Sequence, residues 1–180
     1  KYVGKARVGL HCYFILHAVD FLKLEGIYAA VLPESVFVAD YARGIRQFIL
    51  QNLAIEFFIT SEAKTTFSEG CDFKEVLFVA RKINSAKTND WTAKFVVLKN
   101  DLSLTNTKNI AKMILEENNA CQNEFFDMML VRKSELLRER NWMTFAKPQA
   151  LRFITDVISH SKHVAKGRDI LVPSEGMHLD

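Results

Sequence analysis

Residues 24–35 read Leu-Glu-Gly-Ile-Tyr-Ala-Ala-Val-Leu-Pro-Glu-Ser. The six apolar residues 27–32 follow a glycine and precede a proline, a run too short for a free-standing helix. We therefore expect a strand that is buried on both faces, which is typical of α/β sheets. Pro33 ends this strand because it cannot donate to a ladder. The loop that follows leaves the carboxyl end of the strand, where open α/β sheets bind ligands.

The segments on either side of this strand have helical periodicity. Residues 10–22 predict a helix whose apolar positions recur three and four residues apart, namely Leu10, Tyr13, Phe14, His17, Phe21 and Leu22. On this face we expect His17 to be a hydrogen-bonded core histidine. A second helix is predicted with Asp40 as its candidate N-cap, and its outward residues are Arg43, Arg46 and Gln47. Its apolar face comprises Tyr41, Ile45, Phe48 and Ile49.

Further along the chain, strand and helix patterns alternate less regularly. Residues 53–59 and 75–80 predict two strands, and the polar loop between them contains no helix, which favours an antiparallel hairpin at the sheet edge. Weaker patterns predict a strand at 94–99, a helix at 106–117, a strand at 126–131 and a helix beginning at Pro148.

Composition limits the class of protein. The 180 residues carry a net charge of +3 that is spread along the chain, so charge alone does not imply nucleic-acid binding. Cys12, Cys71 and Cys121 lie far apart, which favours a reduced, cytoplasmic protein. No apolar run approaches the ~20 residues of a membrane span, so no membrane partner is expected. The first residue is Lys1, which indicates an internal piece of a longer protein.

Few residues have the spacing of a chemical site. Glycines between a strand and a helix, which would cradle a nucleotide, are absent, as is the P-loop pattern. His160 and His163 are three residues apart and could bind a metal from one helix. Without a third ligand nearby, solvated surface histidines are the simpler interpretation. From the residues alone, we expect no metal site and no catalytic group.

Four blocks in residues 10–82 nevertheless resemble a known family. They are Tyr13-Phe14-Ile15-Leu16-His17-Ala18-Val19-Asp20-Phe21-Leu22-Lys23, Gly26-Ile27-Tyr28-Ala29-Ala30-Val31-Leu32-Pro33-Glu34-Ser35, Ile45-Arg46-Gln47-Phe48-Ile49-Leu50 and Phe67-Ser68-Glu69-Gly70-Cys71-Asp72-Phe73-Lys74-Glu75-Val76-Leu77-Phe78-Val79-Ala80-Arg81-Lys82. In this order they resemble the carboxyl half of the catalytic domain of N6-adenine DNA methyltransferases from restriction-modification systems, with a gamma-like motif order.

The resemblance implies an α/β fold with a partial Rossmann-like sheet. The three strands of residues 1–82 would be the fifth, sixth and seventh of the methyltransferase sheet, with the last one antiparallel. Residues 83–147 would be an insertion or covering segment of mixed α/β structure. Residues 148–180 would form a helix and the start of a target-recognition domain, to which Trp142-Met143-Thr144-Phe145 and residues 164–170 are loosely similar.

Two motifs of this family are missing from the sequence. Such enzymes bind S-adenosylmethionine through a Phe-x-Gly-x-Gly loop and hold the target amino group with an Asn-Pro-Pro-Tyr or Asp-Pro-Pro-Tyr loop. Both would precede Lys1, so we expect an isolated chain that is inactive and binds no cofactor. The alternative is a non-catalytic DNA-binding or subunit-docking module with half of the fold. A third interpretation is an unrelated α/β protein with the same rhythm of helices and strands.

The resemblance also implies DNA as a partner and gives candidate residues. Phe67 matches the family's aromatic residue that stacks on a flipped adenine, although many loop aromatics simply fix a loop to a sheet. The basic residues expected nearest the DNA backbone are Lys64, Lys74, Lys166 and Arg168, for which ordinary solvated charge is the alternative.

The first strand would have an unpaired inner edge if its sheet partners are missing. An open apolar edge favours a homodimer, a swapped sheet or a cover supplied by the missing amino-terminal half. The alternative is that residues 85–141, which include Phe95-Val96-Val97-Leu98, fold back and pair with this edge.

Overall fold

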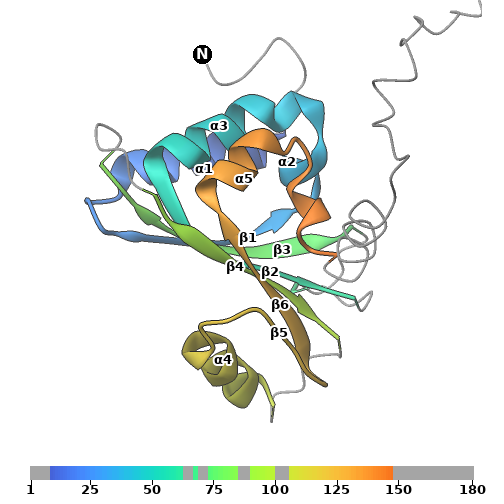
Figure 1. Cartoon of the computed structure of the whole chain (residues 1–180). Helices are drawn as coiled ribbons and strands as arrows, with labels where there is room; N and C mark the ends of the chain where they lie inside the picture. Colours follow the sequence, from blue (N-terminus) through green and yellow to red (C-terminus); the bar gives the residue numbers. More distant parts are fainter. Residues whose placement is uncertain (1–8, 63–66, 69–72, 85–89, 100–105, 148–180) are drawn as a thin grey trace, which may run out of the picture. The chain divides into compact units, whose positions relative to one another are not determined.

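The computed structural model describes residues 9–62, 67–68, 73–84, 90–99 and 106–147. They form one six-stranded mixed sheet with helices on both faces (Figure 1). The elements in chain order are α1 (Leu10–Phe21), β1 (Ile27–Pro33), α2 (Ser35–Val38), η1 (Asp40–Ala42), α3 (Arg43–Asn52), β2 (Leu53–Ser61), β3 (Glu75–Lys82), β4 (Thr92–Leu98), α4 (Thr107–Glu116), β5 (Cys121–Gln122), β6 (Phe126–Arg132), α5 (Lys133–Arg138) and η2 (Trp142–Thr144).

The strand order is β1-β3-β2-β4-β6-β5. β3 is antiparallel to β1 on one side and to β2 on the other, which confirms the predicted antiparallel third strand. The position of this hairpin at the sheet edge was wrong, because β2 continues the sheet by pairing in parallel with β4. The strands of residues 83–147 therefore extend the sheet begun by residues 1–82, and the proposed domain boundaries stay predictions.

Two hydrophobic clusters lie on opposite faces of the sheet. Helices α1, α2, α3 and α5 cover one face, and α4 lies on the other (Figure 1). On the larger side, Phe58 of β2 stacks on Phe95 of β4 with ring centroids 4.4 Å apart, and Phe37 of α2 meets Phe58 at 4.8 Å. Aromatic pairs at such distances add to the free energy of burial.

A tight turn connects α1 to β1. Glu25 has a positive φ of 64°, and Gly26 donates its N–H to the Lys23 carbonyl at 2.9 Å. A Cβ at Gly26 would lie 2.8 Å from that carbonyl oxygen, so only glycine fits. Lys82 Nζ of β3 donates to the carbonyls of Val19 and Leu22, both at 2.7 Å, and thereby places a cation at the helix carboxyl end.

The predicted buried face of α1 is wrong. Cys12, Ile15 and Val19 are the buried residues, whereas the predicted stripe of larger residues faces outward. The side chains of Phe21, Leu10 and Phe14 are 87%, 75% and 70% exposed. His17 lies on the same exposed side, so its prediction as a core histidine fails as well. The reason is that α1 packs on β1 and α3 with its smaller residues.

β1 is buried on one face only, contrary to prediction. Tyr28 and Leu32 point into the larger cluster, but Ile27 and Val31 on the other face are 49% and 40% exposed. β1 is also a terminal strand of the sheet, and no strand of the described residues pairs with its outer edge. The alternative that 95–98 pairs there is wrong, because these residues belong to β4 between β2 and β6.

Candidate functional site

Three strands end together at one edge of the sheet. β1 and β2 are each antiparallel to β3, and β4 is parallel to β2, so the carboxyl ends of β1, β2 and β4 lie on the same side. The start of β3 is tied to this edge, since Glu34 donates its N–H to the Lys74 carbonyl at 2.9 Å. In an open α/β sheet, this is the edge at which ligands bind.

A cavity of about 620 Å³ opens at the carboxyl end of β1. Its polar lining residues are His11 of α1, Glu34 and Ser35 after β1, and Lys74 before β3. Tyr41 donates its hydroxyl hydrogen to Ser35 Oγ at 3.0 Å, which orients that side chain. Burial lowers the pKa of His11, and its Nε2 atom is buried without a hydrogen-bond partner. A carboxyl group, an amine, an imidazole and a hydroxyl group thus share one open cavity.

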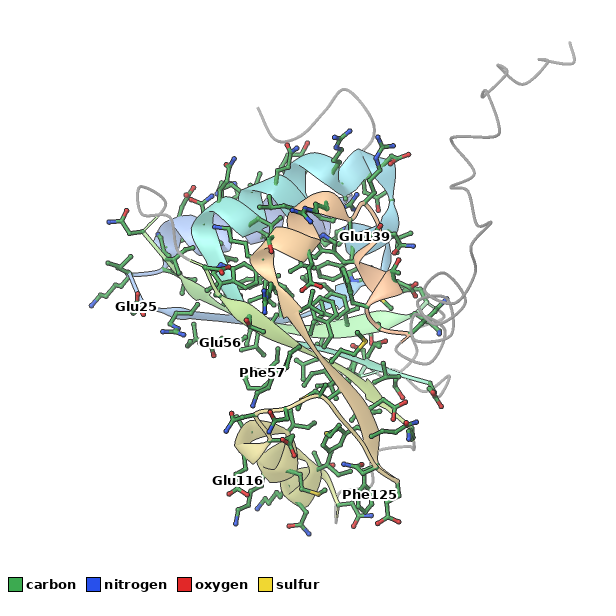
Figure 2. All side chains as sticks on the ribbon, viewed as in Figure 1. Glu25, Glu56, Phe57, Glu116, Phe125 and Glu139 are labelled. Atoms are coloured by element: carbon green, nitrogen blue, oxygen red, sulfur yellow. The ribbon has the colours of Figure 1, made fainter. Side chains whose placement is uncertain are left out.

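Phe67 lies at the same edge but on the other face of the sheet. It is half-buried against the smaller cluster and lines a cavity of about 500 Å³ between the sheet and α4. Phe57, labelled in Figure 2, points from β2 into this cavity, and Lys94 Nζ lies 5.5 Å from its ring centroid. Ser68 donates its N–H to the buried carboxylate of Glu75 at 3.0 Å, which fixes the chain next to Phe67.

The chemistry of this second cavity is apolar. Apart from Thr107, its lining residues are hydrocarbon or aromatic, including Ile59, Leu77 and Ile110. A flipped adenine is held by stacking and by hydrogen bonds to its Watson–Crick edge. If Phe67 stacks on such a base, the polar edge of the base must therefore face away from the apolar cavity.

The predicted site residues are only partly brought together. Phe67 and Lys74 both lie at the carboxyl edge, with the Lys74 side chain exposed, but they line different cavities. Lys64, Lys166 and Arg168 lie outside the described residues, as do His160 and His163. Among the residues that the structure describes, no group of three or more His, Cys, Asp or Glu side chains could hold a metal ion.

Sequence reasoning missed His11 and misplaced Arg46. His11 sits in the first turn of α1, where no motif marks it. Arg46 was predicted to point outward but is 3% exposed, and its Nη1 donates to the carbonyls of Val36 and Ala39 at 2.8 and 2.9 Å. Its position four residues after Ala42 and three before Ile49, both buried, puts it on the buried helical face, which is the signal that could have revealed it.

The helices of the described residues are all too short or too polar to cross a membrane. No protein-family model matches the chain, and no curated protein matches it.

Solved structures do resemble it. The type IIG restriction endonuclease BpuSI matches with a TM-score of 0.61 and 18% identity over 88% of this chain and 19% of that chain. A structure describing assembly and conformational transition of a type I restriction-modification system matches with a TM-score of 0.55 and 12% identity over 83% of this chain and 38% of that one. The type I methyltransferase subunit from Streptococcus thermophilus has a TM-score of 0.51 and 19% identity over 70% and 27%.

Because the sequence identities are between 12% and 19%, these matches show a similarity of fold only. The chain spans between 19% and 38% of the length of these three structures. Its six-stranded mixed sheet with helices on both faces is a mixed α/β fold that resembles part of these restriction-modification structures.

Proposed function

We propose that this chain is part of a DNA methyltransferase that transfers a methyl group from S-adenosylmethionine to adenine N6. The observation that carries the proposal is the arrangement of β1, β2 and β3, with the loop that bears Phe67 at the carboxyl edge, in a methyltransferase-like fold. In this proposal, the chain supplies one wall of the base pocket, and the remaining walls come from polypeptide outside it.

The described residues do not fit the cofactor. A nucleoside cofactor needs backbone N–H groups that approach it closely at a glycine-rich turn after a strand. The residues that follow β1, β2 and β4 are Glu34, Glu62 and Lys99, and none is a glycine. We therefore expect no binding of S-adenosylmethionine to the isolated 180-residue chain. Calorimetry that shows tight, saturable binding to the purified chain would contradict the proposal that the cofactor site lies outside it.

DNA is the proposed substrate. Lys74 is exposed beside the cavity at the end of β1, where it could neutralise a backbone phosphate. Lys64, Lys166 and Arg168 are proposed to contribute in the same way. Such contacts position the DNA without reading its sequence.

Phe67 is proposed to stack on the extruded adenine. Extrusion of a base costs a few kcal/mol, which stacking on an aromatic side chain partly offsets. Its half-buried position against the smaller cluster leaves part of the ring accessible. The same position supports the alternative that Phe67 fixes its loop to the sheet.

Replacing Phe67 by alanine in the full-length protein tests this role. We expect weaker binding and slower methylation of the target adenine, with little loss of folding stability, because a stacking surface is removed. A matched control is Phe125→Ala, since Phe125 is also half-buried and packs against the same cluster but does not line the apolar cavity. The control should lose stability without a specific loss of base binding.

The opposite result would assign Phe67 a structural role. A truncated core phenylalanine costs ~3 to 5 kcal/mol of folding stability. If Phe67→Ala loses that much and methylation per folded molecule is unchanged, the stacking role is wrong.

A non-catalytic subunit-docking module is the second candidate, and the surface of α1 and β1 favours it. Lys82 N donates to Gly26 O at 2.8 Å, and Glu34 N donates to Lys74 O at 2.9 Å. The pairs 26–82 and 34–74 are therefore hydrogen-bonded pairs at the two ends of the antiparallel β1–β3 ladder. Because bonded and non-bonded pairs alternate, residues 27, 29 and 31 direct their N–H and C=O groups to the open edge.

The coding sequence upstream of Lys1 separates the candidates. A cofactor loop followed by an Asn-Pro-Pro-Tyr loop favours the enzyme.

A further inference from the structure

A small cavity lies between α3 and α5, apart from the two cavities described above. Its volume is about 150 Å³, several times the ~30 Å³ of one water molecule. Arg43, Arg46 and Gln47 line it from α3, and Arg138 and Arg140 line it from the end of α5 and the turn that follows. Segments far apart in the sequence thus bring four arginines to the lining of one cavity.

Arg46 is the buried member of this group. Its Nη1 donates to the carbonyls of Val36 in α2 and of Ala39 just after α2, but its Nη2 atom is buried without a hydrogen-bond partner. A buried donor without a partner costs free energy, and such atoms in native proteins generally have an unseen partner. Burial also lowers the pKa of Arg46, the direction expected when a cation is desolvated without a bonded anion.

The protein itself supplies little compensating negative charge. Glu139, labelled in Figure 2, is the acidic residue that lines the cavity, and its Oε1 accepts the N–H of Asn141 at 3.0 Å. Asp40 favours the charged form of Arg46 without forming an ion pair with it. No ion pair of the described residues includes Arg43, Arg46, Arg138 or Arg140. A water molecule could satisfy Nη2 but would leave the excess positive charge uncompensated.

We propose that this cavity binds one phosphate group, with Arg46 as the buried donor and Arg43, Arg138 and Arg140 as exposed donors. Guanidinium groups suit this ligand because their planar donors match the oxygens of a phosphate in pairs. The same chemistry fits a backbone phosphodiester of DNA or a free phosphate. The phosphate site does not depend on methyl transfer, so its test is independent of the test of the proposed function.

The test uses the whole 180-residue chain and inorganic phosphate, with sodium chloride at matched ionic strength as the reference. We expect saturable phosphate binding by calorimetry. The variant Arg43→Gln/Arg138→Gln should bind phosphate at least tenfold more weakly. Both side chains are exposed, so the fold should survive, whereas Arg46 also bonds to carbonyls at α2 and would be needed for the fold. The matched control is Lys108→Gln/Lys112→Gln, which removes two exposed charges from α4 and should bind normally.

Two outcomes would overturn the site. One is the absence of saturable phosphate binding at matched ionic strength, and the other is an equal loss of binding in both double variants. If phosphate binds, a short DNA duplex identifies the source of the ligand. Displacement of phosphate by the duplex supports a backbone phosphodiester, and retention of phosphate supports a free phosphate.

Discussion

Protonation of His11, in the cavity at the end of β1, is expected to make the folding stability depend on pH. Burial lowers the pKa of His11 from its ordinary value near 6.5. The unfolded chain therefore takes up a proton at a higher pH than the folded one, so stability is present above pH ~6.5 and is lost as the pH falls below it. Glu34 and Lys74 line the same cavity as His11.

Urea unfolding at pH 8 and at pH 5.5 measures this contribution. Between pH 8 and pH 5.5, we expect the free energy of unfolding to decrease more in the wild type than in His11→Gln, whose side chain does not titrate. His17→Gln is the matched control, because His17 is exposed on the same helix. An identical pH dependence in the wild type and His11→Gln would rule out the coupling.

Single residues also show where sequence patterns mislead. Arg46 is polar by type but lies among Ile45, Phe48 and Ile49 on the buried side of α3, because two carbonyls satisfy its Nη1. His17 is surrounded by apolar residues in the sequence yet is exposed. Residue type gives an average preference for burial, whereas for Arg46 the hydrogen-bond partners outside its own helix decide the case.

At the scale of elements, the existence of helices and strands was easier to predict than their buried faces. The predicted strands at 53–59, 75–80, 94–99 and 126–131 correspond to β2, β3, β4 and β6. A short apolar run predicts that an element is buried but does not indicate which of its faces packs against the core. Nothing in α1 alone indicates that Cys12, Ile15 and Val19 face the sheet rather than the larger stripe.

Two features of the described residues favour association with another chain, namely the exposed apolar stripe of α1 and the open edge of β1. Monomeric proteins rarely expose large contiguous apolar patches, and an unpaired strand edge invites pairing with another chain. We therefore expect the isolated 180-residue chain to self-associate. Light scattering should show a mass above that of one chain, and Phe14→Ser/Phe21→Ser should reduce it.

These two substitutions should leave the fold intact. Phe14 and Phe21 are largely exposed, so the free energy of unfolding should change by no more than ~0.5 kcal/mol per site. Ile15→Ser, on the buried side of the same helix, is the destabilising control. A wild type that is monomeric and exchanges the amide hydrogens of residues 27–32 rapidly would show that the open edge of β1 is neither paired nor covered.

At the scale of the whole molecule, the sequence predicted the class and the antiparallel third strand but not the complete sheet. The resemblance predicted β1, β2 and β3 as three strands of one sheet, whereas the continuation of that sheet through β4, β6 and β5 was not predicted. Parallel pairing of β2 with β4 joins segments that no local pattern relates. Likewise, the arginine cavity depends on α3 and α5 meeting over the sheet, which neither helix encodes alone.

The strand order has a consequence for how the chain folds. β1 is made before β2 and β3, but β3 is its only strand partner in the described residues. A ribosome adds ~5 to 20 residues per second, so β1 and the apolar α1 emerge well before the strand they need. β2 and β3 are neighbours in the sequence, and such local pairings form faster than non-local ones. We therefore expect the hairpin of β2 and β3 to form first and β1 to pair with β3 afterwards.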